Sequence, residues 1–125
     1  MARILLIDDS KIMCLTLKAL LENRGHKIVG EAGDGLAGYD KYFELKPDIV
    51  ITDLTMPILN GIATIKKIRE EDSNAKIILL TSNTNDEKLS EAVKAGVAEI
   101  LFKPVDENQL MKAVDHIINK EGETG

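Results

Sequence analysis

The sequence predicts an α/β fold: a single domain of five strand–helix units, (βα)5, built on a doubly wound parallel sheet of five strands. Two observations lead to this prediction. Short apolar runs recur along the chain, and the longer segments between them carry apolar residues at helical spacing. Strands and helices that alternate in this way are typical of a parallel sheet with helices on both faces. A length of 125 residues suits one compact domain with its own core.

Two strand–helix units are expected in the first part of the chain. Residues 3–7 form a continuous apolar strand, and residues 11–24 follow as a helix. Residues 26–32 form a more polar strand, which we place at an edge of the sheet. A second helix over residues 36–45 ends before a proline, because the residue before proline disfavours helix. The residues of the first helix expected to face the core are Ile12, Leu15, Ala19 and Leu20.

The third unit starts with an apolar, β-branched strand at residues 49–51, which ends at Asp53. Its helix spans residues 61–71. The first, third and fourth strands are nearly continuous apolar runs, so they should be central in the sheet. The residues of the third helix that should face the core are Ile62, Ile65 and Ile68.

The last two units complete the pattern. Residues 77–80 form the fourth strand, and Thr84 with Glu87 three residues later resembles a capping box that starts the next helix. Residues 99–102 form the fifth strand, and Asp106 caps the last helix. The residues of the last helix that should face the core are Leu110, Val114, Ile117 and Ile118.

Composition narrows the class of protein. Hydrophobic residues make up 44% of the chain and charged residues 30%, which is typical of a globular protein. The net charge of −5, with 2 Tyr, 2 Phe and no Trp, argues against a nucleic-acid surface. The sequence shows no membrane-spanning run, no signal-peptide pattern and a single cysteine, Cys14. We therefore expect a cytoplasmic protein with no membrane span, no internal disulfide and no cysteine metal cluster.

Residues with phosphate or metal chemistry follow four of the five predicted strands: Asp8 and Asp9, Asp53, Thr81 with Ser82, and Lys103. The carboxyl ends of parallel strands lie at one edge of the sheet, where ligands bind in open α/β folds. Each residue by itself has an ordinary structural role, since an aspartate turns the chain, a threonine bonds the backbone and a lysine is solvated. Their coincidence at one edge favours a functional site.

The expected chemistry of this edge is phosphoryl transfer. Three carboxylates in one cleft repel one another, and a divalent cation relieves the repulsion. Oxygen ligands suit Mg²⁺, which also pairs with phosphate oxygens. Lys103 would add a positive charge and Thr81 a hydroxyl donor, so the expected anion is a phosphoryl group. An aspartate can be the nucleophile and form an acyl phosphate, since its ordinary pKa of about 3.9 keeps it ionised at neutral pH.

With these motifs the sequence resembles the receiver domains of two-component response regulators. The matching motifs are Asp8-Asp9, Asp53 followed by Met56-Pro57 and Gly61, Thr81-Ser82, and Lys103-Pro104. The resemblance implies a flavodoxin-like fold with strand order 2-1-3-4-5. It covers nearly the whole chain, so we expect a receiver domain over residues 1–120, with the last helix ending near Asn119 and residues 121–125 as a frayed tail.

The resemblance also implies the roles of the site residues. Asp53 would be the phosphoacceptor, and the ligands of Mg²⁺ would be Asp8, Asp9, Asp53 and the main-chain carbonyl of Thr55. Lys103 would contact the phosphoryl group, and Thr81 would move to bond it. The family also has a cis bond between the lysine and proline that match Lys103 and Pro104, whereas sequence alone favours trans.

The implied function is that of a phosphoprotein switch in a two-component phosphorelay. A histidine kinase or phosphotransfer protein would donate the phosphoryl group, and binding of an output protein that the sequence does not name would change at the face made by the fourth helix, fifth strand and fifth helix. The protein would catalyse only its own phosphoryl transfer and dephosphorylation. That makes it a switch rather than an enzyme.

One position departs from the family pattern. The family often has Tyr or Phe three residues before the lysine, where this chain has Ile100. An inward rotation of an aromatic ring is impossible there. Phe102 lies two residues on and, by strand alternation, on the same face. It either presents a ring to partners or belongs to the core at the sheet edge, and we favour the core.

Other functions fit less well. An aspartate-nucleophile phosphatase of the haloacid dehalogenase type also uses Asp, Thr, Lys and Mg²⁺, but carries Asp-x-Asp after its first strand, where this chain has Asp8-Asp9. A flavodoxin would bring a flavin phosphate against those two carboxylates, and a P-loop hydrolase needs a G-x-x-x-x-G-K-[ST] motif. Cys14 is expected to be packed and neutral, His26 to be a solvated loop residue, and His116 to lack the helical-bundle context of a phosphodonor histidine.

Overall fold

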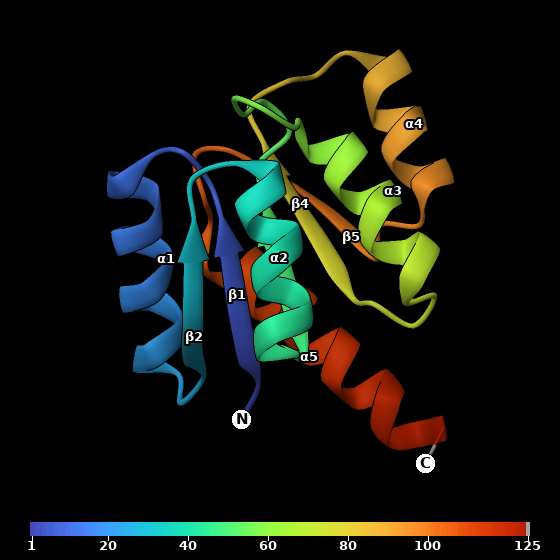
Figure 1. Cartoon of the computed structure of the whole chain (residues 1–125). Coiled ribbons are helices and arrows are strands. Elements are labelled where there is room, and N and C mark those ends of the chain that lie inside the picture. The colour runs from blue at the N-terminus through green and yellow to red at the C-terminus, as the bar shows by residue number, and fades with distance from the viewer. Residues whose placement is uncertain (125) are drawn as a thin grey trace.

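The computed structural model describes the backbone of residues 1–124 and the side chains of residues 1–119. Within that part of the chain, five strands alternate with five helices, as the sequence predicts (Figure 1). The strands are β1 (Arg3–Ile7), β2 (Lys27–Ala32), β3 (Ile49–Thr52), β4 (Ile77–Thr81) and β5 (Glu99–Phe102). The helices are α1 (Lys11–Asn23), α2 (Gly35–Leu45), α3 (Gly61–Glu71), α4 (Asp86–Ala95) and α5 (Glu107–Thr124). None of the described helices has the length and apolar character that crossing a bilayer requires.

The strands form one parallel sheet in the order β2-β1-β3-β4-β5, which confirms the predicted flavodoxin-like fold. β3 and β4 are buried along their whole length, and β1 is buried except at its first residue. Their continuous apolar runs reflect helices that cover the sheet on both faces. The more polar β2 is partly exposed at an edge, also as predicted.

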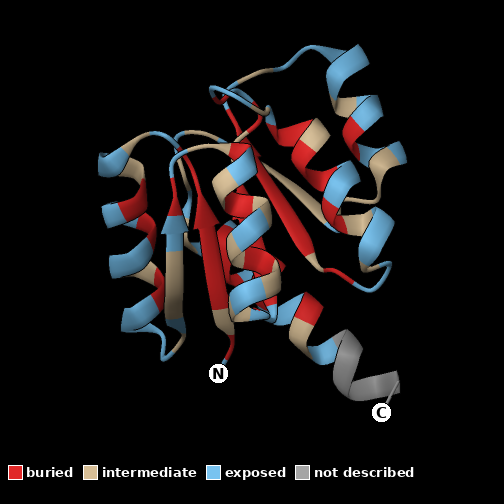
Figure 2. Ribbon diagram, in the orientation of Figure 1, coloured by how far each residue is buried: buried red, intermediate tan, exposed pale blue. Residues whose placement is uncertain are grey.

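Successive side chains of the central strands enter two separate cores, one on each face of the sheet. Ile4 and Leu6 of β1 pack beneath α1 and α5, whereas Leu5 and Ile7 pack beneath α2, α3 and α4. Figure 2 shows this burial as red on the central strands β1 and β4 and on the inner sides of the helices. α4 contributes a single buried residue, Ala92, so it is the helix least tied to the sheet among those described.

The predicted core face of α1 is wrong except at Leu20, which is partly buried against the core, and Ala19 is exposed. Ile12 and Leu15 are exposed, whereas Cys14, Leu17 and Leu21 point into the core. The sequence of α1 has apolar residues on more than one side, so helical spacing alone fits two phases. The phase is decided by how the helix docks beside β1 and α5, in the core that these three residues share.

The start of α4 and the end of α5 also differ from the prediction. α4 is capped by Asn85 instead of Thr84, because Asn85 Oδ1 accepts a hydrogen bond from the Lys88 amide at 3.1 Å. Asp106 caps α5 as predicted, by accepting from the Gln109 amide at 3.1 Å. α5 continues past the expected end at residue 119 to Thr124. The side chains of residues 120–125 and the backbone of residue 125 lie outside the described part, so the frayed tail stays a prediction.

Candidate functional site

Three carboxylates gather at the carboxyl edge of the sheet. Ile7 of β1 pairs with Thr52 of β3, so the residues that follow these strands, Asp8 and Asp53, emerge side by side. Asp9 completes a cluster in which one oxygen of each carboxylate lies within 4.8 Å of the others. Asp8 is buried, Asp53 is partly buried and Asp9 is exposed, so the cluster opens to solvent on one side.

Lys103 reaches this cluster from the end of β5. Its Nζ lies 3.0 Å from Asp8 Oδ2 and 3.5 Å from Asp53 Oδ1. The exposed fractions of the side chains are 18% for Lys103, 4% for Asp8 and 12% for Asp53, so this contact is largely shielded from water. The bond between Lys103 and Pro104 is cis, as the family resemblance implies and as propensity alone does not.

The electrostatic environment of Asp53 differs from that of an aspartate in water. Burial raises its pKa, the ammonium of Lys103 opposes the rise, and the neighbouring carboxylate of Asp8 adds to it. The Leu54 amide donates a hydrogen bond of 2.8 Å to Asp53 Oδ1, which favours the charged form. The pKa of Asp53 therefore lies above the ordinary aspartate value expected from the sequence, and Lys103 limits the rise.

Thr81 ends β4 at the same edge of the sheet and is buried. Its Oγ1 accepts a hydrogen bond from the Asn83 amide at 2.9 Å. The hydroxyl oxygen thus holds the turn that leads toward α4, and its proton remains for donation to another group. The contact is local, since it joins residues two apart in the chain.

The loop that follows Asp53 carries the exposed Thr55 and contains an unusual turn. The Leu59 amide donates to the Pro57 carbonyl at 2.7 Å, which closes a γ-turn whose central residue, Ile58, has φ of 69°. The Gly61 amide donates to the Leu54 carbonyl at 2.8 Å and closes the loop. Sequence reasoning missed Ile58, because isoleucine gives no signal for a positive φ.

The residues that the sequence analysis set aside have structural contacts. Cys14 is buried, and burial raises the pKa of its thiol to about 11. His26 is not the solvated residue that was expected, since its Nδ1 accepts a hydrogen bond from the Ala2 amide at 3.0 Å. His116 Nδ1 lies 2.8 Å from Glu99 Oε1, which links α5 to β5.

The two apolar residues near the end of β5 have different environments. Ile100 is partly buried and packs against the core under α2, α3 and α4. Phe102 is 44% exposed, so the preference for a core position is wrong. Because β5 is an edge strand, no neighbouring strand covers the ring on its outer side.

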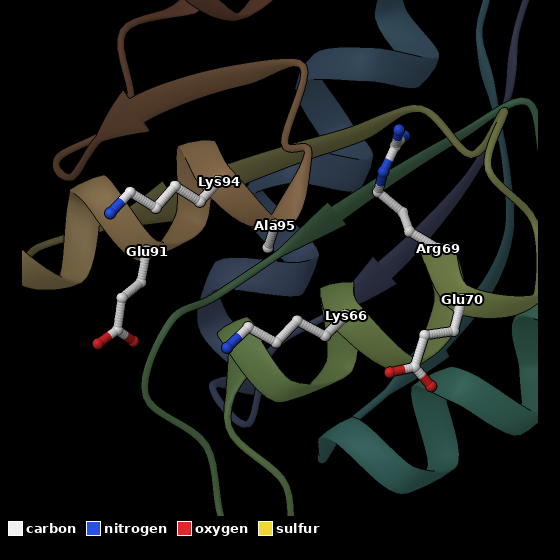
Figure 3. A pocket seen from close by; sticks show the side chains of 6 residues that line it. All are labelled: Lys66, Arg69, Glu70, Glu91, Lys94 and Ala95. Atoms are coloured by element: carbon white, nitrogen blue, oxygen red, sulfur yellow. The ribbon is translucent and has the colours of Figure 1, made fainter.

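A surface hollow of ≈ 370 Å³ lies between α3 and α4, away from the residues at the strand ends. The residues that line it are Lys66, Arg69, Glu70, Glu91, Lys94 and Ala95 (Figure 3). Arg69 donates a hydrogen bond to the Ala75 carbonyl at 2.8 Å, so its guanidinium has a structural role. The lining as a whole mixes three cationic and two anionic side chains.

Comparisons with known proteins agree with this arrangement. A family model for the response regulator receiver domain matches residues 4–115. Chemotaxis protein CheY of Thermotoga maritima is 39% identical, over 92% of this chain and 96% of the relative. A response regulator receiver domain protein of Clostridium thermocellum has a TM-score of 0.92 at 31% identity, over 100% of both chains. The CheX–CheY–BeF3–Mg²⁺ complex of Borrelia burgdorferi matches with a TM-score of 0.89 at 27% identity, over 93% of this chain and 88% of that chain. By its sequence and its fold, this chain belongs to the family of response regulator receiver domains.

Proposed function

We propose that this protein is a phosphorylation-controlled signalling switch of a two-component system, in which Asp53 accepts a phosphoryl group from a histidine kinase or a phosphotransfer protein. One observation carries the proposal: the Lys103 ammonium lies within 3.5 Å of Asp53 and within 3.0 Å of Asp8, in the same carboxylate cluster. A cation so placed can stabilise an anion that joins Asp53. The family acts as a signalling switch, and we propose that its chemistry here is limited to its own phosphoryl transfer and dephosphorylation.

The carboxylate cluster fits Mg²⁺ as its cofactor. Asp8, Asp9 and Asp53 offer three hard oxygen ligands within 4.8 Å of one another, which suits one small divalent cation. We propose the main-chain carbonyl of Thr55 as a further ligand, since Thr55 follows Asp53 by two residues in an exposed loop. Bound Mg²⁺ would neutralise negative charge on the phosphoryl oxygens. The relative from Borrelia burgdorferi in complex with CheX, BeF3 and Mg²⁺ supports this assignment.

The proposed reaction uses Asp53 as the nucleophile. One carboxylate oxygen attacks phosphorus and forms an acyl phosphate, while the bond between phosphorus and the donor nitrogen breaks and its electron pair leaves with the imidazole. Lys103 already faces Asp53, so a short movement would bring its ammonium to the new phosphoryl oxygens. In doing so it would loosen its contact with Asp8.

The proposed conformational response runs through Thr81. Its buried hydroxyl can donate to a phosphoryl oxygen, and it also accepts from the Asn83 amide, so its movement would shift the turn before α4. α4 follows readily because Ala92 is its one buried residue. The exposed Phe102 would then offer an aromatic contact to an output protein on the face of α4, β5 and α5.

We propose that the protein that donates the phosphoryl group binds to the exposed apolar residues of α1. Ile12 and Leu15 are exposed and follow Asp8 and Asp9 closely, so a partner seated on them would bring its phosphohistidine near the carboxylates. We further propose that residues 1–120 form the receiver domain with residues 121–125 as its tail, and that the protein acts in the cytoplasm, where two-component kinases deliver phosphoryl groups.

Mass spectrometry after incubation with acetyl phosphate and Mg²⁺ tests the proposal. The native protein should gain one phosphoryl mass, and Asp53→Asn should gain none. Equal labelling of the two proteins would show that another residue is the acceptor. Turnover of p-nitrophenyl phosphate separates this proposal from a haloacid dehalogenase-type phosphatase, since steady release of nitrophenol that depends on Asp8 would favour the enzyme.

A further inference from the structure

The turn centred on Ile58 is strained and is not held by its own side chain. A γ-turn with a positive φ at its centre is the rare, strained form, and a β-branched residue tolerates that φ poorly. Ile58 is 77% exposed, so burial of its side chain does not offset this strain. Strained backbone persists only where its surroundings fix it, so other contacts must hold the loop.

One contact that holds the loop beside the strained residue comes from the start of α2. Gly35 is the first residue of α2, and its amide has no acceptor within the helix. It donates instead to the Leu59 carbonyl at 3.1 Å, directly after the strained residue. A Cβ on Gly35 would lie 2.2 Å from that carbonyl oxygen and 2.1 Å from Thr64 Oγ1. Only glycine allows α2 to approach the loop this closely.

We propose that Gly35 is a positioning residue for the loop that follows Asp53. Its amide and its missing side chain hold the strained turn at Ile58, and so fix the path of the backbone from Asp53 through Thr55. The effect that Gly35 is expected to have on the metal site rests on the proposed function. The inference extends that function by linking the site to α2, the helix before β3, which packs on the same face of the sheet as α3.

Two glycines near the start of α2 provide a matched test. In Gly35→Ala the Leu59 carbonyl must move from 2.2 Å to at least 3.0 Å from the new Cβ, whereas nothing lies within 4 Å of a Cβ at Gly33. Gly35→Ala should shift the amide resonances of Thr55 to Leu59 and weaken Mg²⁺ binding about tenfold or more, as loss of an outer-shell contact does at other metal sites. Gly33→Ala should change neither. Native affinity and native loop shifts in a folded Gly35→Ala protein would overturn the proposal.

Substitutions at Ile58 test the turn without touching α2. Glycine adopts φ of 69° readily, whereas proline is locked near −65° and cannot form this turn. Ile58→Gly should keep the native Mg²⁺ affinity and raise the thermal midpoint, while Ile58→Pro should lose about tenfold or more in affinity. If Gly35→Ala fails to fold, this pair still shows whether the turn at Ile58 positions the metal site. Equal Mg²⁺ affinities for the glycine and proline variants would show that the turn does not position the site.

Failure of the proposed function gives a different result. If the native protein takes no phosphoryl group from acetyl phosphate, the phosphoacceptor assignment is wrong, but Mg²⁺ titrations still test the loop. If the native protein binds no Mg²⁺, the amide spectra of the metal-free proteins decide: shifts at Thr55 to Leu59 in Gly35→Ala, and their absence in Gly33→Ala, support the positioning role. Unshifted spectra in both variants overturn it.

Discussion

Replacing Lys103 by methionine should destabilise the metal-free protein strongly. The ammonium touches two carboxylates whose exposed fractions are only 4% and 12%, so the substitution leaves shielded negative charges without their cation. Removing one partner from a buried ion pair costs about 3–5 kcal/mol, and the 18% exposure of Lys103 favours the lower end, about 3 kcal/mol. In a domain of 125 residues this corresponds to a fall in Tm of roughly 10 °C.

Mg²⁺ and acid should each reduce this loss. Mg²⁺ at a hundredfold excess over its Kd stabilises by about 2.7 kcal/mol, and the variant should gain more than the native protein because it lacks the competing ammonium. Lys103 lowers the pKa of Asp53, so its removal raises that pKa further. The folded state then takes up a proton at a higher pH than the unfolded state. The deficit in stability should therefore shrink as the pH falls through the raised pKa.

Urea unfolding followed by circular dichroism measures these differences, with EDTA or millimolar Mg²⁺ and from neutral pH down to about pH 4. Lys18→Met is the matched control, because Lys18 is exposed on α1 and should stay within about 0.5 kcal/mol of the native protein. If Lys103→Met unfolds with the native midpoint in EDTA, the ion pairs with Asp8 and Asp53 contribute nothing and the electrostatic reasoning is wrong.

Four further outcomes follow from the structure. Asp53→Asn should raise the Tm of the metal-free protein at neutral pH, and the gain should vanish as the pH falls through the raised pKa of Asp53; a constant gain across pH in thermal scans would refute this. Thr81→Val should lose about 1–3 kcal/mol in urea unfolding because the Asn83 amide loses its acceptor, and it should lose most distant amide shifts on addition of beryllofluoride, whereas Thr81→Ser keeps both. Cys14 should react with iodoacetamide far more slowly in the folded protein than in urea, since its thiol is buried and its pKa is raised to about 11; similar rates would contradict that burial. Leu15→Glu should keep labelling by acetyl phosphate but slow transfer from a partner kinase, and unaltered transfer would place the donor elsewhere.

The sequence by itself determined the elements, their order and several of the residues that meet at the carboxyl edge of the sheet. Apolar runs such as residues 77–80 predict buried strands, because neither face of a strand that is covered on both sides contacts water. The polar residues of β2 predicted a position at an edge, because part of an edge strand is exposed to water. Asp8, Asp53 and Lys103 were expected at one edge because all strands of a parallel sheet end there, and the structure brings them together.

Tertiary structure decided what depends on neighbours that are distant in the sequence. Ile12 and Leu15 suited a core face as well as Cys14 and Leu17 did, and only docking of α1 against the sheet and α5 chose between them. Phe102 is exposed because β5 has a neighbour on one side only. The raised pKa of Asp53 comes from burial and from Asp8, with Lys103 opposing the rise, and the loop with the turn at Ile58 accepts a hydrogen bond from Gly35; all of these are contacts that only the fold creates. A local pattern reports the preferences of one segment, whereas burial, charge and strain are set by the segments that pack against it.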